Sequence, residues 1–507
     1  MKTNLRTYFL VALVQVLEGW RHLLELHNGT MLLLFLPHME RLRWNLGKLK
    51  ALAVFEEARR RTPAYRQFLA EHPFGRMRFR SLVVPDLGRV PVMDKENYVK
   101  RFDIGARCRG GRVPSHGVIV DESSGSSGVP TNWVRGHAER QANKRMLEFG
   151  LTRLIGEGPH FILNAFAMGP WATGINITMG LTDISMLKST GPDVPKIANT
   201  LRFFGPGHRY LVLGYPPFLK LLVDTAGIDW AAYDVSMIYG GEGISELMRD
   251  YLLAKGIRRV YGSLGASDLE LNIAAENDFT IGLRKALLAS PALRAKLLHF
   301  PGAVPVVFQF NPADFHLETT RAGELLVTLC RPNYLSPKIR YNLHDRAQII
   351  RFPELKRLLR SCGLRPEDFA LSYSDLPILL HYGRADMTVA YFGCKVSPPD
   401  VQEALLGVPE LAERVASFTL FTSEGPQADK QLRICFELAE RQPLRIRNDA
   451  ALNDLFFEEL RRINQDFRES WRMVPEGQKP QVEFFAYKTG PFADEDIRIK
   501  RRYIQAA

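Results

Sequence analysis

The sequence has few cysteines and no arrangement of them that holds a metal or a disulfide framework. Five cysteines are scattered along 507 residues, none forms a CxxC pair, and the twelve histidines include no HExxH motif. A structural zinc site and a disulfide-stapled fold are therefore excluded as organising features. Isolated cysteines suit a reducing compartment, so we expect a cytoplasmic protein.

Long hydrophobic runs are also missing. Residues 8–17 are apolar apart from one glutamine, and residues 31–36 are all apolar. Both runs are shorter than the ~18–20 residues that cross a bilayer, and no small-residue cleavage site follows the first one. Two interpretations stay open. The helices pack on the protein body, which we favour, or they lie at a membrane surface with Trp20 and Arg21 at the interface.

Composition and charge indicate an ordinary globular protein. The chain is too long for one hydrophobic core, so we expect two or three domains. Apolar residues make up 46% and charged residues 24%, which excludes a disordered chain. The net charge of +12 can attract phosphate ligands, nucleic acid or anionic lipid. No lysine/arginine run exceeds three residues, so we favour a solvated basic surface and expect no nucleic-acid partner.

The most informative stretch is a serine- and glycine-rich run. It reads Ser123, Ser124, Gly125, Ser126, Ser127, Gly128, Val129, Pro130 and Thr131. Glycine lacks a Cβ, so the backbone N–H groups of such a loop can approach a polyanion closely. A Walker A loop is excluded, because no Lys-Ser/Thr pair follows the glycine. By itself, such a run is more often a flexible surface loop.

Short apolar strands alternate with helices in the first 262 residues. We expect helices at about 40–62 and 136–151, and strands at 161–166, 210–214 and 235–239. This alternation predicts an α/β domain with a largely parallel sheet. Ligands of such sheets bind beyond the carboxyl ends of the strands, where several glycines stand here.

Beyond residue 323 the pattern changes to β, and the last part of the chain predicts a small α+β domain. Strands are expected at 418–421 and 431–438, and one amphipathic helix at 452–467. The predicted domains are a helical extension (1–50), a large domain (51–382) and a small domain (383–507).

These pieces, in this order, resemble the adenylate-forming superfamily, and most closely its phenylacetate–CoA ligase branch. The resemblance covers about residues 50 to 507, and the serine/glycine run resembles the branch's phosphate loop, although Val129 stands where a lysine is common. The other matching segments are Gly240–Gly243 (adenine turn), Tyr261–Ser263 (aromatic motif), Arg340–Asp345 (ribose motif) and Gly383–Asp386 with Gly393–Pro398 (hinge).

The resemblance implies a large N-terminal adenylation domain with mixed or parallel sheets, and a small mobile C-terminal α+β domain. It also implies that ATP activates an acid to an acyl-adenylate, pyrophosphate leaves, and coenzyme A takes the acyl group as a thioester. Three alternatives stay open. In the first, the acceptor of the acyl group is a carrier-protein thiol or an amine. In the second, the protein binds a nucleotide or an acyl group without turnover. In the third, N-terminal helices at a membrane surface dominate the function.

The resemblance implies a nucleotide site in which positioning and charge stabilisation carry the rate. Tyr261 would stack on adenine, and Asp345 would accept both ribose hydroxyls. The implied phosphate contacts are Ser123, Ser124, Gly125, Ser126, Ser127, Gly128 and Thr131, and the remaining nucleotide contacts are Gly241, Glu242, Gly262, Ser267 and Arg384.

Two basic residues are implied to be catalytic. Lys500 is the best match for the family's C-terminal lysine, with Lys488 as the alternative. Its charge would stabilise the developing negative charge on the α-phosphate and carboxylate oxygens. Arg340 would hold a phosphate or the Asp345 loop. Asp386 is the implied hinge residue.

A metal ligand and an acid pocket complete the expected site. Asp268 would help to hold Mg²⁺ where the family usually has a glutamate, with Glu270 or Glu276 as substitutes. The acid pocket is expected to contain Phe166, Trp171 and Tyr239, which favours an aryl or fatty acid. The oligomeric state is left open, with a homodimer among the options.

Overall fold

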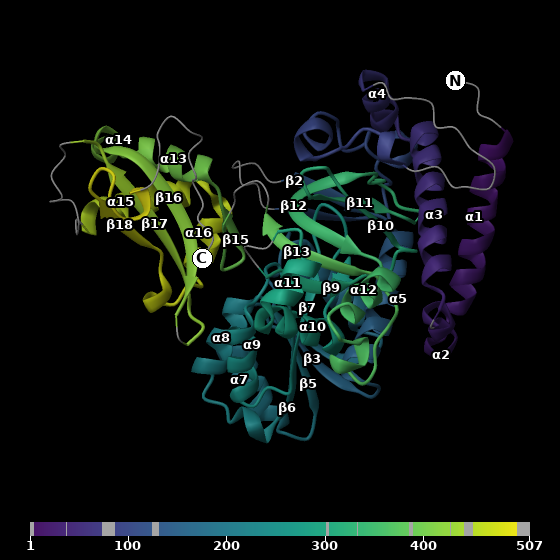
Figure 1. Ribbon diagram of the computed structural model, residues 1–507, viewed down its shortest axis with the longest axis horizontal. Helices are drawn as coiled ribbons and strands as arrows, with labels where there is room; N and C mark the ends of the chain where they lie inside the picture. The colour runs from purple at the N-terminus through teal and green to yellow at the C-terminus, as the bar shows by residue number, and fades with distance from the viewer. Residues whose placement is uncertain are drawn as a thin grey trace.

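The computed structural model describes residues 5–36, 38–72, 87–123, 131–300, 304–331, 333–384, 389–425, 427–440 and 450–493. Figure 1 shows two long N-terminal helices at one edge, a large sheet-containing body in the middle and a smaller α+β unit at the other end. The expected fold class, a large α/β domain followed by a small α+β domain, is confirmed.

The N-terminal segment is helical and packs on the large domain. Helix α1 (Leu5–Leu24) lies beside α3 (Glu40–Arg61), and the short α2 (Asn28–Met31) and η1 (Leu32–Phe35) connect them. The expected helix at 40–62 is confirmed. It ends where α4 (Pro63–Glu71) begins, because proline disfavours a helical conformation in the residue before it.

Eleven strands form one mixed sheet in the order β10-β11-β12-β13-β9-β8-β7-β6-β5-β3-β4. The half from β7 to β4 is parallel, and the other half is antiparallel. The expectation of a largely parallel sheet is therefore correct for one half only. The parallel strands are β3 (His160–Asn164), β4 (Ser185–Ser189), β5 (Arg209–Gly214), β6 (Asp234–Gly240) and β7 (Arg259–Leu264). The others are β8 (Ala274–Ala275), β9 (Val306–Gln309), β10 (Phe315–Thr319), β11 (Glu324–Leu329), β12 (Tyr341–Ile350) and β13 (Ile378–Arg384).

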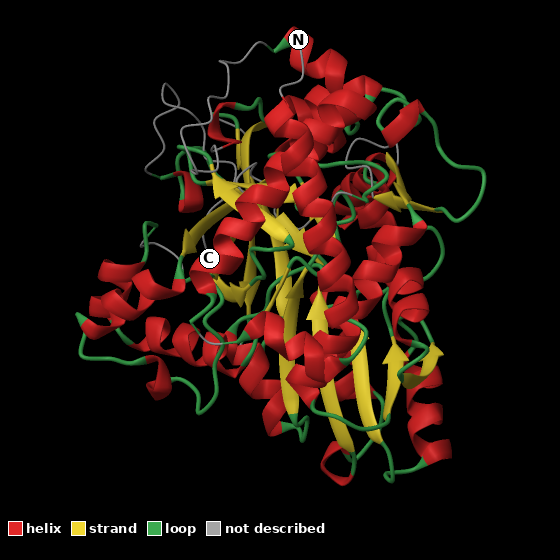
Figure 2. Cartoon of the chain, turned by 90° about the vertical axis from the view of Figure 1, so that its right-hand side faces the viewer, coloured by secondary structure: helices red, strands yellow, loops and turns green. Residues whose placement is uncertain are grey.

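Helices cover both faces of the parallel half, as Figure 2 shows. Alternate side chains of β5 point to opposite faces: Tyr210 and Val212 pack with α7, α8 and α9, whereas Leu211 and Leu213 pack with α5 and α6. The helices of this domain are α5 (His137–Ile155), α6 (Ala172–Leu181), α7 (Val194–Phe204), α8 (Pro216–Thr225), α9 (Glu246–Ala254), α10 (Asp278–Ala289), α11 (Pro291–Leu297) and α12 (Phe352–Arg360).

The small domain has its own hydrophobic core. The expected single helix at 452–467 is wrong, because the chain breaks at Asn464 into α15 and α16. The Asn464 side chain accepts from the N–H of Phe467 and donates to the carbonyl of Lys395, so its hydrogen bonds favour the break. The elements are β14 (Val389–Tyr391), β15 (Cys394–Val396), α13 (Pro398–Leu406), α14 (Pro409–Arg414), β16 (Val415–Glu424), β17 (Lys430–Leu438), α15 (Ala450–Ile463), α16 (Gln465–Trp471) and β18 (Gln481–Phe485).

All five cysteines are free thiols. Cys108, Cys330, Cys394 and Cys435 are buried, and burial raises the pKa of each of these four thiols. In the part of the chain that the structure describes, no helix is both long enough and apolar enough to cross a membrane.

Candidate functional site

An antiparallel hairpin holds the two ends of the serine/glycine run opposite each other. Strand β1 (Ile119–Ser123) pairs with β2 (Thr131–Arg135), and Ser123 faces Thr131 in the last pair. The hairpin therefore brings these two hydroxyl groups to the base of the loop. The loop residues Ser124, Gly125, Ser126, Ser127 and Gly128 lie outside the described residues.

Arg135 joins this hairpin to the segment that contains Asp268. Its buried guanidinium donates to Asp121 at 2.6 Å, to the Ser267 carbonyl at 2.8 Å and to the Leu269 carbonyl at 2.7 Å. One arginine thus fixes the base of the loop relative to the expected metal ligand. Ser267 contributes its carbonyl to this clamp.

Lys95 lies next to the base of the same loop. Its Nζ donates to Ser123 Oγ at 3.3 Å. Burial lowers the pKa of Lys95, the charge of Asp268 opposes this shift, and the charges of Lys100 and Lys395 add to it. A cation therefore contacts Ser123, and its pKa responds to the charge of Asp268.

The position of Lys95 follows from a local cap. Asp94 accepts a hydrogen bond from the N–H of Asn97 and starts the helical turn Lys95–Val99. The sequence analysis assigned no chemistry to this lysine. The available signal was Val129, which leaves the loop without a lysine, so a cation has to come from another segment.

Asp268 is the most accessible of the three candidate carboxylates. It is half-buried and accepts a hydrogen bond from the Tyr341 hydroxyl at 2.6 Å. Glu270 and Glu276 are buried. Glu276 already accepts from Arg249 at 2.8 Å, from Tyr239 at 2.8 Å and from the Gly262 N–H at 2.7 Å, so it has no room for a metal.

These oxygen donors fit Mg²⁺ held largely by its substrate. Among the described residues, no group of three His, Cys, Asp or Glu side chains could hold a metal ion. Mg²⁺ commonly takes one or two protein carboxylates and completes its shell with phosphate oxygens and water. Asp268 beside the phosphate loop suits that arrangement.

Asp345 and Arg384 are brought together by the pairing of β12 with β13. Asp345 accepts from His381 Nε2 at 3.1 Å and lies 3.3 Å from Arg384 Nη1. Burial alone would raise the pKa of Asp345, but the His381 hydrogen bond and the charges of His381, Arg384 and Lys395 lower the pKa overall. Asp345 is therefore an ionised acceptor, as a ribose contact requires.

Arg340 acts as a structural tie in this arrangement. Its buried guanidinium donates to Glu318 at 3.1 Å, to the Gly88 carbonyl at 3.2 Å and to the Val90 carbonyl. These contacts hold the segment that leads to Lys95. They do not support the expectation that Arg340 holds a phosphate.

The aromatic motif is packed into the core. Tyr261 is 4% exposed, and its hydroxyl donates to Asp278 at 2.6 Å. Stacking on adenine needs an exposed ring face, so this conformation does not support the stacking role. The next residue must be glycine, because a Cβ at Gly262 would lie 2.6 Å from the Tyr239 hydroxyl oxygen.

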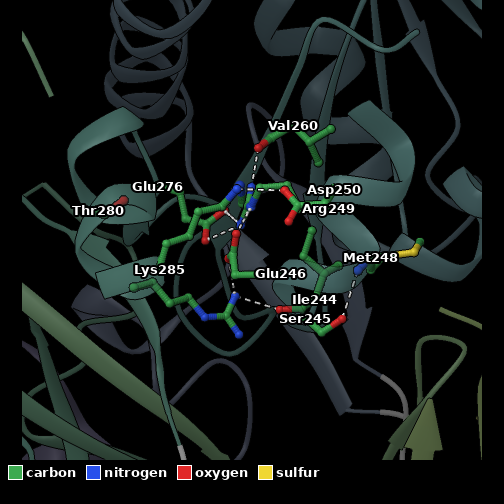
Figure 3. A network of polar contacts seen from close by, with 12 residues as sticks. Ile244, Ser245, Glu246, Met248, Arg249, Asp250, Val260, Glu276, Thr280 and Lys285 are labelled. Atoms are coloured by element: carbon green, nitrogen blue, oxygen red, sulfur yellow. Dashed lines mark hydrogen bonds and ion pairs between the residues drawn. The ribbon is translucent and has the colours of Figure 1, made fainter. Parts of the chain in front are cut away.

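A buried ionic cluster supports this region. Figure 3 shows Arg249 of α9 pointing toward Glu276 and Glu246, and Arg249 also donates to the Val260 carbonyl. Arg284 of α10 completes the cluster at 3.0 Å from Glu246. We call these four side chains the central network. It fixes β7 and the Gly262 turn relative to α9.

The adenine turn carries contacts to the small domain. Gly241 has a left-handed φ of 89°, and a Cβ there would clash with the Tyr215 ring. Glu242 pairs with Lys430 of β17 at 2.6 Å, and Ser245 donates to Glu424 at 2.5 Å. Two further predicted residues, Asp386 and Lys500, lie outside the described residues.

The expected acid-pocket residues differ in exposure. Phe166 and Tyr239 are buried, whereas Trp171 is half-buried. The backbone of Trp171 forms an isolated parallel β-bridge with Glu122 of β1. A cavity of about 90 Å³ lies nearby, beside Arg135, and neither Phe166 nor Tyr239 lines it. Its lining is mostly polar: Arg135, Glu139, Arg140, Gln141, Asn143, Lys144, Leu147, Asn176, Met179, Gly180 and Glu270.

Comparison with known proteins identifies the fold. No model of a known protein family matches the chain, and no curated protein sequence matches it. Among solved structures, 2-hydroxyisobutyryl-CoA ligase in complex with 2-HIB-AMP and CoA superposes with a TM-score of 0.62 at 16% identity, covering 93% of this chain and 90% of that one. The large and small domains described above thus share the fold of 2-hydroxyisobutyryl-CoA ligase.

Two further structures are more distant. An open conformation of the same ligase has a TM-score of 0.49 at 14% identity, covering 91% of this chain and 90% of that one. The amide bond synthetase McbA from Marinactinospora thermotolerans has a TM-score of 0.45 at 15% identity, covering 74% and 66%. The phenylacetate–CoA ligase branch stays a prediction.

Proposed function

We propose that this protein is an ATP-dependent acid ligase that forms an acyl-adenylate and then transfers the acyl group to coenzyme A. The observation that carries the proposal is the hydrogen bond from Lys95 to Ser123 at the base of the serine/glycine hairpin, which Arg135 ties to the segment of Asp268. These segments supply a cation, hydroxyl donors and a carboxylate, which suits a metal-bound polyphosphate. The fold shared with a ligase whose structure contains an acyl-AMP and CoA supports the same reaction class.

The proposed first step is attack of the substrate carboxylate oxygen on the α-phosphorus of ATP. One P–O bond forms, the bond to pyrophosphate breaks, and pyrophosphate leaves with its electron pair. Lys95, Ser123 and Thr131 would hold the outer phosphates, and Lys500 would stabilise charge at the α-phosphate. Asp268 would hold Mg²⁺, which supplies counter-charge when bound. Asp345 would accept the ribose hydroxyls.

In the second step, the thiol sulfur of coenzyme A attacks the acyl carbon. A C–S bond forms, the bond to AMP breaks, and the thiol loses its proton. We propose an aryl or fatty acid as the substrate, because the half-buried Trp171 lies next to β1. The polar cavity beside Arg135 is the observation that favours hydroxylated or amino-substituted acids as a second class.

The test is ATP–pyrophosphate exchange with a panel of aryl, fatty, hydroxy and amino acids, using Lys95→Ala and its matched control Lys100→Ala. Lys100 lies five residues further on, is exposed and pairs with Glu96. We expect Lys95→Ala to reduce exchange by about 10²-fold and Lys100→Ala to change it by less than about twofold. If the two variants reduce exchange equally, Lys95 has no specific role in the site. If none of the acids supports exchange, the ligase proposal is wrong.

Two additions separate the steps. Lys500→Ala should also lose exchange, and an unchanged rate would reject that residue. Adding coenzyme A, a phosphopantetheine carrier protein or an amine to the adenylating enzyme should give product with coenzyme A only. Product with the carrier protein or the amine would show that coenzyme A is not the specific acceptor.

A further inference from the structure

Helix α1 exposes an apolar stripe. Five side chains at alternating spacings of four and three residues face solvent: Phe9 (70% exposed), Leu13 (38%), Val16 (58%), Trp20 (65%) and Leu23 (56%). This spacing places all five on one face of a helix. Figure 1 shows α1 at the outer edge of the molecule, with α3 on its inner side.

The opposite face of α1 packs on the protein and buries charged side chains beside the fully buried Val14. Arg21 pairs with Asp314 at 2.5 Å and with Glu25 at 2.6 Å, and Glu18 pairs with Lys50 at 2.6 Å. We call these five side chains the helix network. The polarity of α1 is thus partly reversed relative to a surface helix in water, because α1 buries its charges and exposes a long apolar stripe.

This reversal is costly unless the outer face leaves water. Transferring an ion from water into the protein costs several kcal/mol before its pairs compensate. A helix that buries its ions and leaves a tryptophan and a phenylalanine in solvent has an unfavourable free-energy contribution from each of its two faces in water. At an apolar surface, the outer face instead gains about 1.5–3 kcal/mol for each large side chain that becomes fully buried.

The segment after α1 extends the apolar surface. Leu26, Leu32, Leu33 and Leu36 are each 40–50% exposed, and they belong to the connection that leads through α2 and η1 to α3. Single exposed leucines are ordinary, but nine large apolar side chains within 28 residues of sequence are not.

We propose that the protein docks through α1 on an anionic lipid bilayer, with the helix lying in the plane of the interface. The exposed α1 residues that the structure describes include no Asp, Glu, Lys or Arg, so none would be desolvated by lipid. Trp20 suits the headgroup boundary, where tryptophan is enriched. The net charge of +12 draws the molecule toward anionic headgroups.

A second copy of the chain fits this face less well. A helix of 20 residues is about 30 Å long and about 10 Å wide, so its face projects roughly 300 Å². A standard protein interface buries about 800 Å² per partner. A bilayer needs no complementary surface and accepts a narrow stripe along its length. The inference is independent of the proposed enzyme activity.

The test is flotation of the full-length protein with vesicles of phosphatidylcholine, alone or mixed with phosphatidylglycerol. The variant Val16→Glu/Trp20→Glu places charge in the stripe, and Phe203→Glu changes an even more exposed apolar residue on α7. We expect the wild type and Phe203→Glu to float with the mixed vesicles, less so at high salt. The double variant should partition at least about tenfold less.

Several outcomes would overturn the proposal. These are failure of the wild type to float, equal losses in both variants, or a lipid-free dimer in sedimentation that Val16→Glu/Trp20→Glu converts to a monomer. A melting temperature equal to that of the wild type shows that the double variant is folded. If it unfolds, the milder Trp20→Ala replaces it, with the same direction of effect expected.

Discussion

The central network and the helix network use the same chemistry in different places. Both bury arginine and carboxylate side chains in close pairs, such as Arg249 with Glu276 and Arg21 with Asp314. The central network joins elements inside the large domain, where it cannot open unless the domain unfolds. The helix network holds a terminal helix, which can undock as a unit. The position of a buried ion pair therefore decides whether its loss destabilises the whole domain or only the docking of one helix.

The largest effect is expected for Glu276→Gln. It leaves Arg249 buried without its main counter-charge and weakens the hydrogen bond to the Gly262 N–H. Breaking a buried pair costs about 3–5 kcal/mol, and we expect a decrease of that size in the free energy of unfolding. Denaturant titration measures it. A change under about 1 kcal/mol would show that the central network is dispensable.

A smaller global effect is expected for Asp314→Asn. It removes the carboxylate between Arg21 and Arg331, whose charges hold the pKa of Asp314 far below its usual range. Undocking of α1 should limit the loss to roughly 1–3 kcal/mol. Hydrogen exchange should show lost protection in α1, with little change in β5 and β6. Uniform loss across the sheet would contradict the comparison.

A third buried carboxylate, Glu139, lacks an arginine of its own. Burial, with a contribution from the nearby Glu270, raises its pKa to about 7. Between pH 4.5 and 7 the folded state therefore binds more protons at Glu139 than the unfolded state does. Stability should fall as the pH rises through this window, by up to roughly 3 kcal/mol. Glu139→Gln should flatten this dependence in melting temperature against pH, and an unchanged slope would assign it to other groups.

The smallest effect is expected for Asp250→Asn at the rim of the central network. Asp250 pairs with Lys285 at 2.7 Å, and both side chains are about half-exposed. Exposed pairs contribute about 0–1 kcal/mol, so the free energy of unfolding should hardly change. The variant is also the matched control for Glu276→Gln. A decrease in the free energy of unfolding above about 2 kcal/mol would show that the central network includes this surface pair.

Local patterns predicted the elements well. The helix predicted at 40–62 is α3, and the strand predicted at 235–239 is β6. The misses arise where tertiary contacts decide. The break at Asn464 depends on a hydrogen bond to Lys395 of β15, and the antiparallel half of the sheet depends in part on the pairing of β9 with β13, which are far apart in sequence.

The site was predictable as a set of segments but not as a set of contacts. Asp345 and Arg384 were named from separate motifs, and only the pairing of β12 with β13 places them together. Lys95 and Arg135 were missed because their roles depend on partners 28 and 132 or more residues away. Tyr261 was assigned a ligand role because sequence does not reveal whether a ring face is exposed.

The buried cysteines have a consequence for an enzyme that generates an activated acyl group. Cys394 lies in β15, the strand whose Lys395 influences Asp345, and its thiol donates to the Tyr391 carbonyl at 2.7 Å. Burial keeps this sulfur protonated, and only a thiolate is strongly nucleophilic. Under the proposed function, a buried and protonated Cys394 is a poor acyl acceptor, so it does not compete with the thiol of coenzyme A.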